Sequence, residues 1–364
     1  MGFLSEYPLN QYEEMIEELK KVTDPDLHIM IRGGGGTGIR VGEYLDQKGI
    51  NYEGYLVDRE YYSPKLRLNN KPVFCSEDFL SENKCILVVS YVEFDEKLYE
   101  ESLRDNIIKQ YKLDFAGRVP VSDSVDKPLN KEFCEENKEK LIDIYNKLAD
   151  DRSRRALELY FHQKLHGNLT KEYDKDQYFQ DDIFRYSDNE VFVDCGAFQG
   201  ENIRDFINAL KKQGISTYKK IIAMEPDREN LKVLRENTAS YDNIFVCEKG
   251  AWNETTELCF SEGGSASAVC EEGKLKIGVT AIDDIEEARD TSFIKMDIEG
   301  SELQALKGAK RVISENKPKL AICIYHKRED LLEISDYILK LRPDYRIYIR
   351  NHSPYAIETV LYAV

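Results

Sequence analysis

Acidic side chains and a histidine follow short apolar runs in the second half of the chain. Asp194, Glu225, Asp297 and Glu299 each come after a run with the pattern of a buried strand, and His326 comes after another. Because the carboxyl ends of parallel strands meet at one edge of a sheet, we expect these side chains to lie near each other. Carboxylates and an imidazole gathered there could move a proton, orient a hydroxyl group or hold a divalent cation.

The first of these acids opens a glycine-containing turn. Asp194, Gly196 and Gly200 have the spacing Asp-x-Gly-x-x-x-Gly, and residues 201–212 have helical periodicity. The glycines let the backbone pass close under a ligand, and the helix directs free N–H groups and its positive dipole end toward that ligand. An acid here would repel a phosphate but suits an ammonium-bearing ligand. The alternative is a strand–turn–helix unit that binds nothing.

Glu225 follows the next predicted strand, 220–224. Its carboxylate would lie across the cleft from the glycine turn, where it could accept hydrogen bonds from both hydroxyls of a ribose. Trp252 and Asn253 come after the third predicted strand, 243–247.

The elements that must position these residues alternate regularly from residue 191 onward. They indicate an α/β fold: a seven-stranded Rossmann-like sheet with helices on both faces. The short connection before the last strand predicts that this strand is reversed, whereas a dehydrogenase sheet would end parallel. The expected strands are 191–193, 220–224, 243–247, 292–297, 319–324, 345–350 and 358–363, with a hairpin insertion formed by 256–260 and 275–281.

A second glycine-rich turn lies near the start of the chain. Gly33, Gly35 and Gly38 fit the Gly-x-Gly-x-x-Gly pattern between a predicted strand and a predicted helix, and Asp58 lies close to the position of a ribose-binding acid. The turn either binds a nucleotide or nucleotide-sugar or only reverses the chain. The expected elements of this smaller, parallel βαβ, Rossmann-like domain are strands 28–32, 54–57 and 85–90 and helices 10–22, 39–47 and 94–109.

A charged, tyrosine-rich region with helical spacing separates the two patterns. We therefore expect an N-terminal domain at 1–118, a helical connector or cap at 119–188 and a catalytic domain at 189–364. His162 and His166 lie four residues apart in the connector. Because no acid or cysteine is placed to complete a zinc site with them, they are interpreted as surface or packing residues.

The composition is that of a globular protein without a basic footprint. A net charge of −17 and a pI near 5.0 argue against a general partner among nucleic acids or anionic membranes. No segment approaches a membrane span and the N-terminus lacks a signal-peptide pattern, so a cytoplasmic location is expected. The eight cysteines have no C-x-x-C spacing and are expected to be free thiols. Whether the chain forms a homo-oligomer is left open.

The motifs together resemble the FkbM-type S-adenosylmethionine-dependent methyltransferases, which have a class I methyltransferase sheet. The resemblance covers roughly the C-terminal half, and its most specific part is the KMDIEG segment together with Tyr325-His326. The N-terminal domain lies outside it. The matching segments are VFVDCGAFQGEN (191–202), EPD (225–227), KGAWNE (249–254), VTAIDDI (279–285), IKMDIEGSELQALKGA (294–309), AICIYH (321–326), IYIRNH (347–352) and TVLYA (359–363).

The resemblance implies S-adenosylmethionine as methyl donor and a small molecule or glycan, typically a sugar hydroxyl, as acceptor. It also implies that the loop carrying Trp252 covers the adenine; the alternative is that Trp252 is a core aromatic. The implied donor-binding residues are Asp194, Gly196, Ala197, Gly200, Glu225, Trp252 and Asn253.

Methyl transfer to a hydroxyl also needs a base. His326 is the expected base, because its unperturbed pKa lies near neutrality. Asp297 and Glu299 either orient the acceptor, or hold a divalent cation together with His326, or only cap the next helix. A competing function is a nucleotide-binding protein or oxidoreductase that uses the N-terminal glycine turn, with the second half as a scaffold.

Overall fold

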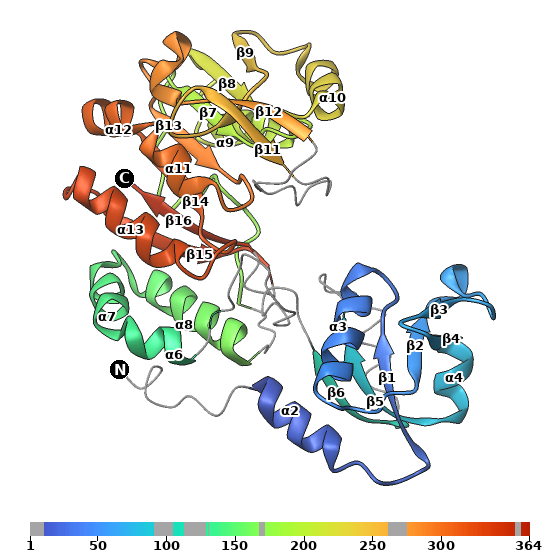
Figure 1. Ribbon diagram of the computed structural model, residues 1–364. Coiled ribbons are helices and arrows are strands. Elements are labelled where there is room, and N and C mark those ends of the chain that lie inside the picture. Colours follow the sequence, from blue (N-terminus) through green and yellow to red (C-terminus); the bar gives the residue numbers. More distant parts are fainter. Residues whose placement is uncertain are drawn as a thin grey trace. The chain divides into compact units, whose positions relative to one another are not determined.

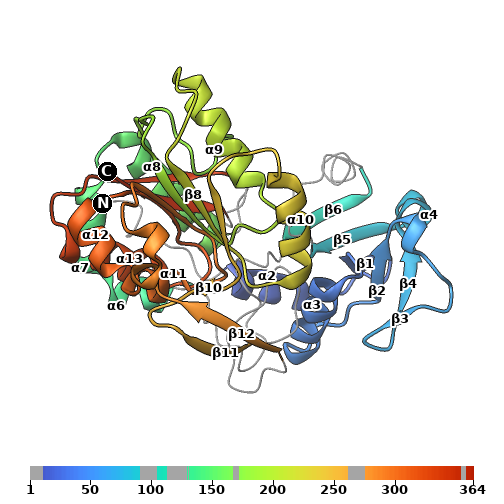
Figure 2. The same cartoon turned by 90° about the horizontal axis from the view of Figure 1, so that it is seen from above.

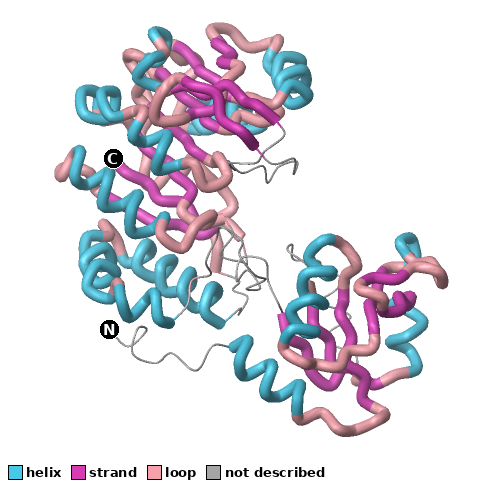
Figure 3. Tube along the Cα trace, in the orientation of Figure 1, coloured by secondary structure: helices cyan, strands magenta, loops and turns pink. Residues whose placement is uncertain are grey.

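The computed structural model describes residues 11–90, 105–112, 129, 131–166, 172–260, 275–353 and 358–364. The chain divides into two compact units, each with its own sheet flanked by helices (Figures 1 and 3). The domain boundaries expected at 118 and 188 stay predictions. The first unit comprises Met1–Glu139, Glu158–Glu172 and Pro354–Ile357, and the second comprises Lys140–Leu157, Tyr173–Ser353 and Glu358–Val364.

The first unit is built on a six-stranded sheet in the order β3-β4-β2-β1-β5-β6. Its strands are parallel except for β3, which pairs antiparallel with β4. The Rossmann-like prediction for this region is therefore confirmed. The strands are β1 Leu27–Arg32, β2 Gly54–Val57, β3 Arg67–Leu68, β4 Lys71–Cys75, β5 Lys84–Val89 and β6 Ile107–Lys112, and the helices are α2 Gln11–Lys20, α3 Gly36–Gln47, the 3-10 helix Arg59–Tyr61 and α4 Ser76–Glu82.

Both faces of this sheet bury apolar side chains. Ile29 and Ile31 of β1 pack on one face with residues of α2 and α3, whereas Met30 packs on the other with Leu80 of α4. Successive residues of a strand point to opposite faces, so a continuous apolar run such as β1 requires helices on both sides.

The helix expected at 94–109 is wrong at its end, because residues 107–109 belong to β6. Residues 94–104 lie outside the described part. β6 pairs parallel with β5 and forms the edge of the sheet. Its short, partly exposed sequence has no strong period of its own, so pairing with a strand some twenty residues away decides its conformation. The two strands β3 and β4 were also not predicted.

The second unit contains the expected seven-stranded sheet, in the order β15-β16-β14-β13-β7-β8-β9. β16 is antiparallel to both neighbours and all other pairs are parallel, which confirms the reversed last strand. The strands are β7 Val191–Cys195, β8 Lys220–Met224, β9 Ile244–Cys247, β13 Phe293–Met296, β14 Lys319–Cys323, β15 Ile347–Asn351 and β16 Thr359–Ala363.

Helices cover both faces of this sheet, with α9 on one side and α11 to α13 on the other (Figure 2). The helix expected at 301–314 is two helices, which part at Gly308 and Ala309. A Cβ on Gly308 would lie 1.9 Å from the carbonyl oxygen of Trp252, so the loop presses against the chain at this point. The helices are α9 Glu201–Lys212, α10 Arg228–Thr238, α11 Glu302–Lys307, α12 Lys310–Asn316 and α13 Asp330–Leu341.

The insertion after β9 forms a small separate sheet in the order β10-β12-β11. β11 and β12 pair antiparallel, as the hairpin prediction required. The small-residue tip at 263–267 lies outside the described residues. The strands are β10 Gly250–Ala251, β11 Thr256–Phe260 and β12 Leu275–Thr280.

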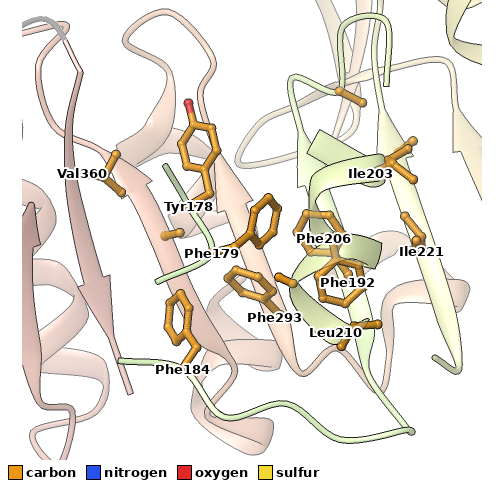
Figure 4. Close-up of a cluster of buried hydrophobic side chains, with 14 of the residues drawn as sticks. Tyr178, Phe179, Phe184, Phe192, Ile203, Phe206, Leu210, Ile221, Phe293 and Val360 are labelled. Atoms are coloured by element: carbon orange, nitrogen blue, oxygen red, sulfur yellow. The ribbon is translucent and has the colours of Figure 1, made fainter. Parts of the chain in front are cut away.

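The region between the sheets is helical up to residue 166, with α6 Lys131–Glu136, α7 Lys138–Lys147 and α8 Asp151–His166. Residues 172–188 form turns and extended chain instead. Phe179 and Phe184 of this segment pack against Phe192 of β7, Phe293 of β13 and Phe206 of α9, on one face of the sheet (Figure 4). The segment is therefore part of the core of the second unit.

Two composition-based expectations can be compared with the structure. Six cysteines are free thiols: Cys75, Cys85, Cys134, Cys195, Cys247 and Cys323. The side chains of Cys259 and Cys270 lie outside the described part. Within the described ranges, no helix combines the length and the apolar character needed to cross a membrane.

Candidate active site

A buried ion pair joins the two central strands of the second unit. Asp194 of β7 stands opposite Lys295 of β13 in the parallel register, and Lys295 Nζ lies 3.1 Å from Asp194 Oδ1. The two side chains are 0% and 1% exposed. Lys295 Nζ also donates hydrogen bonds to the carbonyl oxygens of Gly196 (2.9 Å) and Cys195 (3.3 Å). Through these two hydrogen bonds, Lys295 holds the backbone at the start of the glycine turn in place.

Sequence reasoning missed Lys295, although a signal was present. A lysine inside the apolar strand 293–296 must have a partner, because an unpaired buried charge is strongly unfavourable. Burial acts to lower the pKa of Lys295, but the carboxylates of Asp194 and Asp297 outweigh it and raise this pKa. The ammonium therefore stays charged, as a partner for Asp194.

Asp194 faces this ammonium and not an open space. Neither of its carboxylate oxygens is accessible, and neither makes a hydrogen bond of good geometry. The structure therefore places Asp194 under the turn, where it positions Lys295. Its predicted contact with a donor ammonium stays a prediction.

The turn above this pair has the tight backbone that its glycines indicate. Gly196 (φ 76°) and Gly200 (φ 92°) are left-handed, and a Cβ on Gly196 would lie 2.1 Å from the carbonyl oxygen of Asp297. The N–H groups of Gly196 and Ala197 both donate to the carbonyl of Met224 at 3.1 Å. Gly200 then caps α9. Residues with larger side chains at 196 would separate β7 from the loop after β13.

Glu225 connects the ends of β7 and β8. It is 6% exposed, and its carboxylate accepts the N–H of Phe198 in the turn and the N–H of Asp227, each at 2.9 Å. Burial raises the pKa of Glu225. Each carboxylate oxygen can accept a second hydrogen bond, so the predicted ribose contact is compatible with this geometry and stays a prediction.

Trp252 and Asn253 are tied to other elements. The N–H of Trp252 donates to the carbonyl of Thr280 at 2.9 Å, and Asn253 Nδ2 donates to Gln304 at 3.2 Å. Trp252 is partly buried and Asn253 is exposed. No contact recorded for the described residues links either side chain to the glycine turn, so their roles at the adenine stay predictions.

The structure brings His326, Asp297 and Glu299 together, as the strand ends predicted. His326 Nε2 lies 3.4 Å from Asp297 Oδ1 and 3.6 Å from Glu299 Oε2. A fourth residue, Glu302, completes the cluster, because its Oε1 lies 3.0 Å from His326 Nδ1. The sequence showed Glu302 only as an acid in the first turn of a helix. Its burial, with 0% exposure, was not readable from the sequence.

The charges of this cluster set the protonation of His326. Burial acts to lower the pKa of His326, but Glu302, Asp297 and Glu299 outweigh it and raise the pKa to about 9. At neutral pH the imidazole is therefore in its cationic form, with a proton on each ring nitrogen. This pKa lies above the ordinary value of a histidine, because three carboxylates surround one ring.

Two tyrosines orient Asp297. The hydroxyl of Tyr178 donates to Oδ2 at 2.7 Å, and the hydroxyl of Tyr325 donates to Oδ1 at 3.2 Å. Burial acts to raise the pKa of Asp297, but the charges of Lys295 and His326 outweigh it and lower this pKa. Asp297 is therefore an ionised, fixed carboxylate.

The N-terminal glycine turn has a different surrounding. Gly33 is left-handed (φ 123°), and a Cβ on Gly38 would lie 2.1 Å from the carbonyl oxygen of Gly33. A Cβ on Gly35 would meet no atom within 4 Å. Asp58, the expected ribose acid, forms an ion pair with the buried Arg32 at 2.8 Å. Ligand binding at this turn stays a prediction.

Comparison with known proteins agrees with the geometry of the second unit. Residues 194–347 match the family model described as the methyltransferase FkbM domain. The segment begins at Asp194 and contains the glycine turn, Glu225 and the whole His326 cluster. The match confirms, for this segment, the sequence-based recognition of similarity to FkbM-type methyltransferases. No curated protein matches the chain significantly.

One solved structure has a similar fold over nearly the whole chain. The chain is similar to the methyltransferase FkbM from Methylobacillus flagellatus KT, with 28% identity, a TM-score of 0.74, and coverage of 98% of this chain and 94% of that one. The likeness therefore extends over the N-terminal unit as well. About half of the chain is similar to an rRNA methylase from Streptococcus thermophilus (12% identity, TM-score 0.32, coverage 49% and 86%) and to fibrillarin from Aeropyrum pernix (11% identity, TM-score 0.32, coverage 50% and 70%).

The buried pair makes a testable prediction for stability. Lys295→Met leaves the buried carboxyl group of Asp194 without its partner, so the free energy of unfolding should fall by about 3–5 kcal/mol. Adding Asp194→Asn should restore part of this loss. Urea denaturation followed by circular dichroism measures both changes.

The matched control is Lys219→Met, which removes an exposed lysine paired with Asp290 at 2.7 Å. Its effect should be within about 1 kcal/mol, because exposed ion pairs contribute little. Equal losses for the two lysine variants would contradict the structural role of Lys295.

Proposed function

We propose that the protein is an S-adenosylmethionine-dependent methyltransferase that methylates a hydroxyl group, and that the acceptor is a sugar or glycan. The observation that supports it is the FkbM-type domain at residues 194–347. In this domain the glycine turn and the His326 cluster follow β7, β13 and β14, three adjacent parallel strands. A donor site and a group that handles protons would then share one edge of the sheet.

The glycine turn fits the proposed donor. Gly196 and Gly200 give the turn a left-handed backbone, and the turn leads directly into α9, whose first N–H groups can face a ligand. Glu225 holds this turn and keeps lone pairs for a ribose. When bound, S-adenosylmethionine would supply an electrophilic methyl group on its sulfonium.

The His326 cluster fits the task of activating an acceptor. Asp297 and Glu299 are 26% and 42% exposed, so a hydroxyl can reach them, and His326 lies between them. The imidazole is cationic at neutral pH. It can accept the proton of a hydroxyl only after one of its two ring nitrogens has lost a proton. The carboxylates can meanwhile hold the acceptor hydroxyl by hydrogen bonds.

A second binding function for the N-terminal unit is supported by one observation. The turn at Gly33–Gly38 follows β1 directly, and β5 is the next strand to β1 in the sheet. The strand order reverses between these two strands, which is where α/β sheets commonly bind ligands. We propose a nucleotide or nucleotide-sugar there. The wider alternative, an oxidoreductase with a non-functional second half, has no support from the FkbM-type match.

The remaining sequence-based expectations also belong to this proposal. The absence of a general nucleic-acid partner is supported by the net charge of −17, and the cytoplasmic location stays an expectation.

A first prediction tests the donor site. Glu225→Ala should weaken S-adenosylmethionine binding by about 1.5–3 kcal/mol, because the ribose loses a charged acceptor. Isothermal titration calorimetry measures the affinity. Asp227→Ala is the matched control: it removes the cap of α10 in the same loop but no carboxylate of the proposed site. Unchanged affinity in Glu225→Ala would remove the ribose assignment.

A second prediction tests His326. The His326→Ala variant should still bind the donor, whereas methyl transfer to the true acceptor should slow by roughly 10²–10⁴-fold. Radiolabelled methyl transfer measures the rate, and thermal melting confirms that the variant is folded. His162→Ala, at an exposed histidine, should transfer at the wild-type rate. Wild-type turnover by His326→Ala would show that His326 is only structural.

A third prediction separates the two units. Gly35→Val should abolish nucleotide binding without strain, because φ is −76° and the position faces open space. The affinity for S-adenosylmethionine should not change. Calorimetry with nicotinamide dinucleotides and with a nucleotide-sugar tests the first part. A parallel loss of donor affinity would mean that the two sites are not independent.

A further inference from the structure

The His326 cluster combines three carboxylates with one imidazole. Asp297, Glu299 and Glu302 surround the ring. Lys295, the buried cation nearby, is engaged by Asp194 and two carbonyl oxygens. The next lysine, Lys327, donates to the carbonyl of Gly300. Carboxylates and an imidazole are the side chains that divalent cations commonly bind in proteins.

The two ring nitrogens of His326 face different surroundings. Nδ1 faces Glu302, which is fully buried and whose Oε1 also accepts the N–H of Ile298 at 2.9 Å. Nε2 faces Asp297 and Glu299, which are partly exposed. His326 is 8% exposed, and its Nε2 makes no hydrogen bond of good geometry. A buried polar group in this state indicates a missing partner.

This arrangement matches the way histidines bind metals. A metal-bound histidine usually donates its second N–H to a carboxylate, which fixes the ring. Here Glu302 occupies that second position. Ligand atoms about 2.1 Å from an octahedral ion are roughly 3.0 Å apart when adjacent and 4.2 Å when opposite. The distances from Nε2 to Asp297 and Glu299, 3.4 and 3.6 Å, lie in this range.

We propose that Nε2 of His326, Asp297 and Glu299 bind a divalent cation of the Mg²⁺ or Mn²⁺ type, with Glu302 holding the ring through Nδ1. Carboxylates suit both ions, and the imidazole is better suited to Mn²⁺. The partial exposure of the two carboxylates leaves positions for water and for one further oxygen ligand. The catalytic part rests on the proposed function: the cation would bind the acceptor hydroxyl and lower its pKa.

The cation and the ring proton compete for the same place. Metal binding requires the lone pair of Nε2, so a proton on Nε2 must leave to solvent first. With Nε2 bound to the cation, His326 would not be the base, and the proton of the cation-bound hydroxyl would pass to solvent water at the partly exposed side of the cluster. In the described part of the chain, the group whose donor atoms all lie within 4.8 Å of one another is Asp297, Glu302 and His326, so Glu302 is the ligand that competes with Glu299.

The test measures Mn²⁺ binding without any donor or acceptor. The full-length protein is freed of metal with a chelator and titrated with Mn²⁺, and free Mn²⁺ is followed by electron paramagnetic resonance. The wild type should bind one ion. Asp297→Asn, Glu299→Gln and His326→Gln should each weaken binding by more than tenfold. Glu302→Gln should weaken it by roughly 10–100-fold through the ring.

Two controls keep the result interpretable. Glu229→Gln changes an acid that is 81% exposed on α10 and should bind Mn²⁺ like the wild type. Thermal melting shows whether the buried His326 and Glu302 variants fold; if they do not, the exposed Glu299 variant still decides. The proposal is overturned if the wild type binds no ion at the site, or if Glu299→Gln binds as the wild type does.

The outcomes also separate this proposal from the proposed function. Normal binding of S-adenosylmethionine and full methyl transfer in the presence of chelator would contradict the catalytic role of the cation and support the proposed methyltransferase function. Binding of Mn²⁺ by a protein that has no affinity for S-adenosylmethionine would support the cation site and contradict the proposed function. Loss of transfer with chelator and its recovery with Mn²⁺ would support both.

Discussion

The ion pair between Asp194 and Lys295 is the constraint on which the site depends. Removing an ion from water costs several kcal/mol, so two charges with 0% and 1% exposure must remain together. They belong to the adjacent strands β7 and β13, and their contact agrees with the register that pairs the two residues. Lys295 also holds the carbonyls of Cys195 and Gly196. The shape of the glycine turn therefore follows from the pair.

The charge balance changes just beyond the ends of these strands. Asp194 and Lys295 are matched, which suits a rigid support. Around His326, three carboxylates share one imidazole, and its pKa rises to about 9. Carboxylates gathered around a buried imidazole are typical of places where a proton, a cation or a substrate is bound. The same edge of the sheet thus contains the ion pair that supports the glycine turn and, beside it, the His326 cluster.

The segment before β7 connects the core with this cluster. Phe179 packs with Phe192 and Phe293, while the preceding Tyr178 is left-handed (φ 66°) and directs its hydroxyl away from the aromatic rings to Asp297 (Figure 4). The ammonium of Lys295 lies 5.1 Å from the ring centre of Tyr178. One buried tyrosine therefore contacts both the support and the cluster, so packing in the core positions the carboxylate.

The sequence by itself determined the seven-stranded sheet, its reversed last strand and the grouping of Asp297, Glu299 and His326, because apolar periods and strand ends are local properties. It did not determine β6, whose conformation depends on pairing with β5. It also did not reveal that Glu302 is buried against His326, or that Lys295 forms an ion pair with Asp194. The pKa of His326 is the clearest case: its ordinary value is a property of the residue, whereas its value here is set by three carboxylates that only the tertiary structure brings within 4 Å.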